Sequence, residues 1–190
     1  MNDQTATPAA PSPNQGLYEW IQSLVPMFLV VLILLTFVGR TIGVQHESMT
    51  PTLLDGDRMI VRSIFYTPSQ GDVIIFSRQG VEDGNAMVKR VIAIAGDVVD
   101  IDPVAGIVYV NGIALYEPFT NTPTNRTGDI SYPLTVPEGH IFVLGDNRNH
   151  SRDSRCADIG PVDEREIIGQ VVAVFMPFSR AQFFLGSAGS

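Results

Sequence analysis

The sequence predicts a mainly β protein in which a single N-terminal transmembrane helix precedes an antiparallel β-sheet domain. An uncharged apolar run near the N-terminus predicts the helix. From residue 41 onward, short runs rich in Val, Ile and Phe alternate with Asp-Gly, Gly-Asp, Asn-Gly and Pro, a pattern typical of strands joined by tight turns. We therefore expect one membrane segment and one β-rich globular domain.

Composition limits the class of protein. The 190 residues, 45% of them hydrophobic, suffice for one core of roughly 140 to 150 residues plus a membrane segment. A net charge of −8 argues against nucleic acid as a partner, because nucleic-acid binding needs clustered basic residues. The single cysteine, Cys156, excludes an internal disulfide. Neither an H-E-x-x-H motif nor a second cysteine at ligand spacing is present, so we expect no metal and no other cofactor.

The N-terminal region divides into a tail and a membrane segment. Residues 1–16 are rich in Pro, Ala, Thr and Asn and are expected to form a disordered tail. Residues 17–40 are predicted to form the transmembrane helix, because the eighteen uncharged residues Ile21–Val38 would span about 27 Å, near the thickness of a bilayer core. Tyr18 and Trp20 suit the interfacial aromatic belt. A buried core helix would keep polar positions, and a cleaved signal sequence would carry a basic n-region and a small-x-small site, so a retained span is favoured.

Residues 41–185 are predicted to form the β domain, followed by a flexible tail at 186–190. Strands are expected at Arg58–Ile64, Asp72–Ser77, Met87–Ala95, Val98–Ile101, Ile107–Val110, Ile113–Leu115, His140–Leu144 and Gly169–Phe175. The pair Asn111-Gly112 predicts a hairpin, and Gly80–Asn85 predicts a further turn.

A small irregular subdomain is expected around residues 112–139. Its main part, Glu117–Gly139, holds four prolines together with Thr, Asn and Gly. A stretch of that composition is too long and too rich in turn residues for a simple connection between strands.

Lys89 is the only lysine in the chain, whereas eleven arginines supply the other basic charge. A guanidinium stays protonated at any working pH, but an ammonium desolvated among apolar neighbours can become neutral and accept a proton. Lys89 lies within an apolar run and is therefore a candidate general base. The alternative is a lysine left by a composition that favours arginine, with its ammonium reaching to water.

Two further stretches carry polar groups suited to catalysis. Ser48 precedes Pro51 in a predicted turn about ten residues beyond the apolar run, and a neutral lysine can activate a serine hydroxyl. The alternative for Ser48 is an ordinary turn residue. Gly145–Arg155 is dense in polar side chains directly after a predicted strand, which suits either a hydrogen-bonded scaffold or a solvated turn.

Four segments, Ser48–Thr52, Gly71–Phe76, Lys89–Asp97 and Gly145–Arg155, together resemble bacterial type I signal peptidases. These are membrane-bound serine–lysine proteases that remove signal peptides from exported proteins. Because all four motifs occur in the family's order and approximate spacing, the resemblance is far more specific than any one motif. It extends from the apolar run to about Val174.

The resemblance implies a role for each matching residue. Ser48 would be the nucleophile and Lys89 the general base, and the Ser48 backbone N–H would donate to the oxyanion. His46 occupies a position where some family members carry a hydroxyl donor and others glycine, so its part in the oxyanion hole stays open. The supporting residues implied by the motifs are Arg90, Asp146, Asn147, Ser151, Asp153 and Arg155, with Ser151 orienting the lysine. The residues implied to wall two shallow substrate pockets are Ile42, Val44, Met49, Leu53, Met87 and Val88.

The resemblance also implies partners and a location. The substrates would be signal peptides of secreted preproteins with Ala-x-Ala ends, and the other partners would be the lipid bilayer and, transiently, the export machinery. The N-terminus would be cytoplasmic and the β domain extracytoplasmic in a single-pass topology. The positive-inside rule alone favours the opposite orientation, because Arg40, Arg58 and Arg62 follow the span, but large domains translocate largely regardless of charge.

Three rival functions have weaker support. A Ser–His–Asp triad would use His150 near Asp153, but no G-x-S-x-G setting accompanies it. A cytoplasmic self-cleaving repressor would carry a DNA-binding domain in place of the apolar run. A membrane-anchored binding module would not require Ser48 and Lys89 to lie within these motifs.

Overall fold

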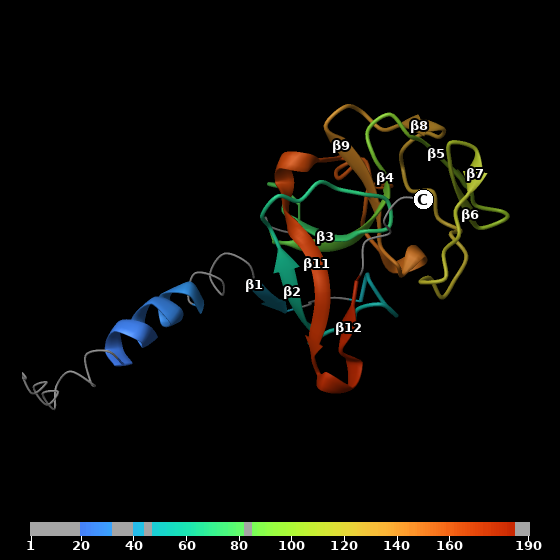
Figure 1. Ribbon diagram of the computed structural model, residues 1–190. Helices are drawn as coiled ribbons and strands as arrows, with labels where there is room; N and C mark the ends of the chain where they lie inside the picture. Colours follow the sequence, from blue (N-terminus) through green and yellow to red (C-terminus); the bar gives the residue numbers. More distant parts are fainter. Residues whose placement is uncertain (1–19, 32–39, 44–46, 82–84, 185–190) are drawn as a thin grey trace, which may run out of the picture. The chain divides into compact units, whose positions relative to one another are not determined.

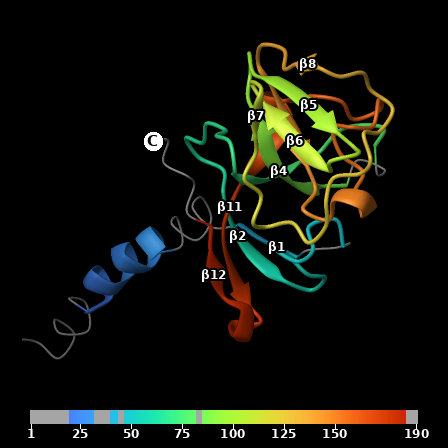
Figure 2. The same ribbon diagram turned by 90° about the vertical axis from the view of Figure 1, so that its right-hand side faces the viewer.

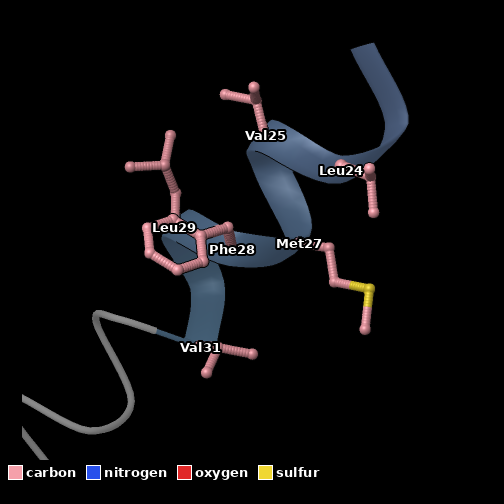
Figure 3. A pocket seen from close by; sticks show the side chains of 6 residues that line it. All are labelled: Leu24, Val25, Met27, Phe28, Leu29 and Val31. Carbon is pink, nitrogen blue, oxygen red and sulfur yellow. The ribbon is translucent and has the colours of Figure 1, made fainter. Parts of the chain in front are cut away.

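The computed structural model describes residues 20–31, 40–43, 47–81 and 85–184. The chain divides into two compact units, Met1–Phe37 and Val38–Ser190. In the first unit residues 20–31 are helical, and their apolar side chains project outward around the axis (Figure 3). Within the described residues, no helix combines the length and the apolar content needed to cross a membrane. Residues 17–19 and 32–39 of the predicted span, and both predicted tails, lie outside the described residues.

The second unit is built on an antiparallel eight-stranded sheet (Figure 1). The strand order is β1-β2-β11-β3-β4-β9-β10, with β12 paired to β11. The bounds are β1 (Arg40–Gly43), β2 (Arg58–Arg62), β3 (Val73–Phe76), β4 (Met87–Ala93), β9 (His140–Leu144), β10 (Val162–Asp163), β11 (Ile167–Met176) and β12 (Gln182–Phe183). Within the described residues, short 3₁₀ helices follow strands at η2 (Arg148–His150), η3 (Glu164–Glu166) and η4 (Phe178–Arg180).

A smaller antiparallel sheet has the order β7-β6-β5-β8 (Figure 2). Its strands are β5 (Val98–Asp102), β6 (Ile107–Val110), β7 (Ile113–Ala114) and β8 (Leu134–Thr135). The predicted hairpin is confirmed, because β6 pairs with β7 and both turn residues have positive φ, 53° at Asn111 and 76° at Gly112. The predicted irregular stretch thus supplies only the short edge strands of a sheet that begins earlier, at β5.

Several predicted strand limits were wrong by a few residues. Strand β4 ends at Ala93 rather than Ala95, because Gly96 takes φ 87° and the Asp97 carboxylate accepts from Ile94 N at 2.9 Å, which closes a turn. Strand β2 ends two residues early, and β11 is longer at both ends than predicted. The short strands β1, β8, β10 and β12 were not predicted, and β1 begins at Arg40, the last residue assigned to the helix.

Strand β3 is buried on both faces, which explains its continuous apolar sequence. Val73 and Ile75 pack into a core cluster with Met49 and Leu53. Ile74 and Phe76 face a second cluster that contains Met87, Val91 and Ile141. Burial of each such side chain contributes about 1.5–3 kcal/mol.

Strand β9 joins the cores of the two sheets. Ile141 and Val143 pack into the cluster of the large sheet, whereas Phe142 and Leu144 pack against residues of β5 and β6. Because successive side chains of a strand point to opposite faces, β9 is fixed from both sides. The packing of β9 on both faces therefore fixes the position at which the following turn begins, at Gly145.

Candidate active site

Ser48 lies in a tight turn that precedes β2. Thr50 N donates to Glu47 O at 3.1 Å, and Leu53 N donates to Met49 O at 2.9 Å. The Met49 and Leu53 side chains are only 1% and 0% exposed. These core side chains anchor the turn, so the half-buried Ser48 is held against the sheet rather than on a free loop.

Lys89 is placed opposite Ser48 by the middle of the large sheet. It sits on β4, with Ile74 of β3 as its register partner, and it is 4% exposed. Its Nζ donates to Ser48 Oγ at 2.8 Å and to the Val88 carbonyl oxygen at 3.0 Å. Burial of an ammonium disfavours its charged form. The structure thus brings together the two residues that the sequence assigned as nucleophile and base.

The turn after β9 binds the backbone of the Ser48 turn. Asn147 N donates to Ser48 O at 3.0 Å, and Asn147 Nδ2 donates to Glu47 O at 3.2 Å. Thr52 Oγ1 donates to Asp146 Oδ2 at 2.5 Å. Three hydrogen bonds therefore connect segments about 95 to 100 residues apart in the sequence.

Gly145 permits the close approach of these segments. A Cβ built at this position would lie 2.2 Å from Ser151 Oγ and 2.5 Å from the Ser48 carbonyl oxygen. The backbone N–H of Gly145 donates to Asp153 Oδ2 at 3.0 Å. Any side chain at position 145 would have to displace backbone beside Ser48.

Two buried ion pairs support the site. Arg90 donates to Asp146 through Nε (2.8 Å) and Nη2 (2.6 Å), and through Nη1 to the Gly71 carbonyl at 2.9 Å. Arg155 donates to Asp153 through Nε (2.7 Å) and Nη2 (2.8 Å). Burial alone would lower the pKa of Arg155, but the hydrogen bond to the Asp153 carboxylate raises it above its ordinary value. Bidentate pairing of this kind fixes orientation as well as charge.

The pairing of these charges was only partly predicted. Sequence reasoning grouped Arg90 with Asp153 and Arg155, whereas Arg90 pairs with Asp146. It also missed Thr52 and the fully buried Arg148, although they lie within the motifs Ser48–Thr52 and Gly145–Arg155. An arginine within an otherwise polar turn gives no signal of burial in the sequence.

Ser151 lies beside the site but does not make the predicted contact. It is 8% exposed, and its Oγ has no hydrogen-bond partner among the residues that the structure describes. The expected hydrogen bond that would orient Lys89 is therefore not formed in this structure. Its closeness to Gly145 nevertheless places the hydroxyl against the turn that holds Ser48.

The residues predicted to wall the substrate pockets are dispersed. Met49 and Leu53 belong to one core cluster, against which the partly buried Val88 packs, and Met87 belongs to another. Met49 and Leu53 are too buried to contact a ligand directly in this structure. Ile42 lies on β1, where only the backbone is described, and Val44 and His46 lie outside the described residues.

The geometry gives no support to the His150–Asp153 alternative. His150 is exposed in η2. Both carboxylate oxygens of Asp153 are occupied, Oδ1 by Arg155 and Oδ2 by Arg155 and Gly145. Among the residues that the structure describes, no group of three His, Cys, Asp or Glu side chains converges as metal ligands.

Comparison with known proteins adds independent information. Residues 17–176 match the family described as signal peptidase, peptidase S26. A probable signal peptidase I-1 of Synechocystis sp. is 37% identical over 179 residues, which cover 90% of this chain and 88% of the relative. A signal peptidase I of Bacillus licheniformis is 33% identical and covers 87% of this chain and 92% of the relative. A solved signal peptidase I of Enterococcus faecalis V583 is 31% identical, covers 56% of this chain and 97% of that chain, and has a TM-score of 0.47.

The family match over residues 17–176 defines the class: the chain belongs to the signal peptidase family, peptidase S26. Within that family its relatives are signal peptidases I, and the chain is an enzyme of that type. The resemblance stated from the four motifs is thereby confirmed. The mainly β, antiparallel architecture is confirmed as well.

Proposed function

We propose that this enzyme is a membrane-bound serine endopeptidase that removes N-terminal signal peptides from exported preproteins through a Ser48–Lys89 dyad. The observation that carries the proposal is the 2.8 Å hydrogen bond between Lys89 Nζ and Ser48 Oγ, with the lysine 4% exposed. A buried amine at hydrogen-bond distance from a hydroxyl has the geometry of a general base and its nucleophile.

In the acylation step, Ser48 Oγ attacks the carbonyl carbon of the scissile bond and its proton passes to Lys89 Nζ. The oxyanion that forms accepts a hydrogen bond from the Ser48 backbone N–H. The C–N bond then breaks, and the proton on Lys89 passes to the leaving amine, which becomes the N-terminus of the mature protein. The signal peptide is left as an ester on Ser48 Oγ.

In the deacylation step, a water molecule attacks the ester carbonyl while Lys89 takes one of its protons. The ester C–O bond breaks, Ser48 Oγ regains a proton from Lys89, and the signal peptide leaves as a carboxylic acid that releases its proton to solvent. The supporting residues act by position: Asp146 and Asn147 hold the Ser48 turn, and Arg90 orients Asp146.

An extended signal peptide would bind alongside the start of β4. Residues 87–90 pair with β3 on one edge, whereas pairing with β9 on the other edge begins at Arg90. Within the described residues, Met87–Lys89 therefore have a strand edge that β9 does not use. Main-chain hydrogen bonds at such an edge read the length and extension of a peptide rather than its sequence.

The apolar run Ile21–Val38 supports single-pass anchoring in the cell membrane. The N-terminus would be cytoplasmic and the β domain extracytoplasmic, where signal peptides become accessible on export. The lipid bilayer and, transiently, the export machinery would then be its partners.

The substrate class can be tested with a preprotein that ends its signal peptide in Ala-x-Ala. We expect cleavage directly after the second alanine, and at least about a hundredfold lower kcat/KM when that alanine is replaced by leucine, because a pocket shaped for a methyl group rejects a larger side chain. N-terminal sequencing of the product and initial rates give the two readouts. Ser48→Ala enzyme is the blank, and equal cleavage of the alanine and leucine substrates would contradict the proposed specificity.

A further inference from the structure

A short stretch of the irregular segment covers the buried arginines beneath the site. The Phe119 ring lies over the Arg90 guanidinium, and its centroid is 3.9 Å from Arg90 Cζ. The same ring centroid is 5.9 Å from Arg148 Cζ. Glu117 accepts from Arg148 Nη1 at 2.8 Å and Nη2 at 2.5 Å. Arg148 also donates to Thr124 Oγ1 at 2.9 Å. Glu117 and Phe119 thus contact the guanidinium groups that support the catalytic turn.

Both guanidinium groups act on the same short piece of backbone. Arg148 Nε donates to the Gly145 carbonyl at 3.0 Å. Arg90 binds Asp146, the next residue, in bidentate fashion. Asn147, which follows, donates its backbone N–H to Ser48 O. Phe119 and Glu117 are therefore each connected to the Ser48 backbone through one arginine and the turn at residues 145–147.

The chemistry of the two residues suits this task. An aromatic ring stacked on a guanidinium excludes water from one face and attracts the cation through its quadrupole. A lower local dielectric strengthens the ion pair between Arg90 and Asp146. Arg148 is 0% exposed, and Glu117 is its carboxylate partner in the described part of the chain. A buried cation deprived of such a partner would have to move toward water.

We propose that Glu117 and Phe119 are positioning residues that hold the 145–147 turn, and through it Ser48, in its reactive position. This proposal rests on the proposed function of Ser48 and Lys89. It assigns a role in the reaction to the irregular segment, which carries none of the four motifs. Phe119 acts through Arg90, and Glu117 acts through Arg148.

The test compares ring and non-ring side chains at position 119 in the full chain, purified in detergent, with a neutral signal-peptide substrate. For Phe119→Leu we expect kcat to fall roughly tenfold with KM within about twofold, since a 1 Å misplacement of catalytic groups can cost about a hundredfold. The loss of kcat should deepen as the salt concentration rises from about 0.1 to about 1 M. Without the ring, water reaches the ion pair between Arg90 and Asp146, and the screening length falls from about 10 to about 3 Å over this range of salt. Phe119→Tyr, which keeps the ring, should restore kcat and salt resistance.

Matched controls come from the same segment. Tyr116 is 84% exposed, and Tyr116→Leu should match wild type in kcat and salt response. Glu117→Gln should lower kcat, whereas Glu138→Gln, at an exposed carboxylate, should not. Should Phe119→Leu fail to fold, Phe119→Met, whose unbranched and flexible side chain can adapt to the space left by the ring, carries the same comparison.

Wild-type kcat and salt response in Phe119→Leu, or an equal loss in Tyr116→Leu, would overturn the positioning role. Ser48→Ala is assayed alongside. An inactive Ser48→Ala with a fully active Phe119→Leu rejects only the positioning role, whereas an active Ser48→Ala rejects the proposed function itself.

Discussion

Lys89→Arg should lose essentially all turnover, by about 10⁴-fold in kcat/KM, the upper end of what a general base contributes. The guanidinium keeps a cation of similar reach within hydrogen-bond distance of Ser48, but it stays protonated and cannot take the serine proton. Initial rates of preprotein cleavage by the purified full chain measure the effect. The thermal midpoint of each variant shows whether the fold survives.

Arg165→Lys is the matched control for this exchange. The Arg165 side chain is 90% exposed in a surface ion pair with Asp163, so its replacement should leave the rate unchanged. Retention of more than about a tenth of the wild-type rate by Lys89→Arg would exclude lysine as the base. Loss of activity in His150→Ala would then favour the histidine alternative.

Gly145→Ala should lower kcat/KM by about a hundredfold. Its Cβ would lie 2.5 Å from Ser48 O and 2.2 Å from Ser151 Oγ, so the nucleophile's backbone must shift, and a shift of 1 Å is enough for a loss of this size. Steady-state kinetics should show the loss mainly in kcat, because the substituted residue lies on the side of Ser48 that faces the protein.

Gly112→Ala separates this steric effect from the general cost of replacing a glycine. Gly112 has φ 76° and open space around its missing Cβ, so alanine there costs about 1–2 kcal/mol of backbone strain and touches nothing. We expect a lower thermal midpoint with full activity. Unchanged activity in Gly145→Ala would show that the Ser48 turn is not held as tightly as its contacts indicate.

Much of the β domain could be predicted from local sequence. Strands such as His140–Leu144 are apolar runs bounded by turn residues, and Asn111-Gly112 encodes its hairpin directly. The strands that were missed are short or depend on a partner. Strand β12, for instance, has two exposed residues and is defined by its pairing with β11.

The pairing of Ser48 with Lys89 was predicted because Lys89 is the only lysine in the chain and because both residues lie within motifs that resemble those of the family. The partner of Arg90 was not predicted, because a buried arginine can pair with any of several nearby carboxylates. Only the register of β4 against β9 places Arg90 beside Asp146. The same holds for Met49, whose apolar character suits a pocket wall and a core equally. The contact of Phe119 with Arg90 joins residues far apart in sequence through a segment without regular structure, where periodicity gives no information.

The central claim is that Ser48 forms a covalent ester with the signal peptide. A peptide ester that mimics an Ala-x-Ala end and carries a fast leaving group should acylate the enzyme faster than water releases it, so that the acyl-enzyme accumulates. Acid quenching, proteolytic digestion and mass spectrometry then locate the added acyl group. We expect the adduct on Ser48, with none in Ser48→Ala and only trace amounts in Lys89→Arg. An adduct on another side chain, or an undiminished adduct in Lys89→Arg, would contradict this expectation.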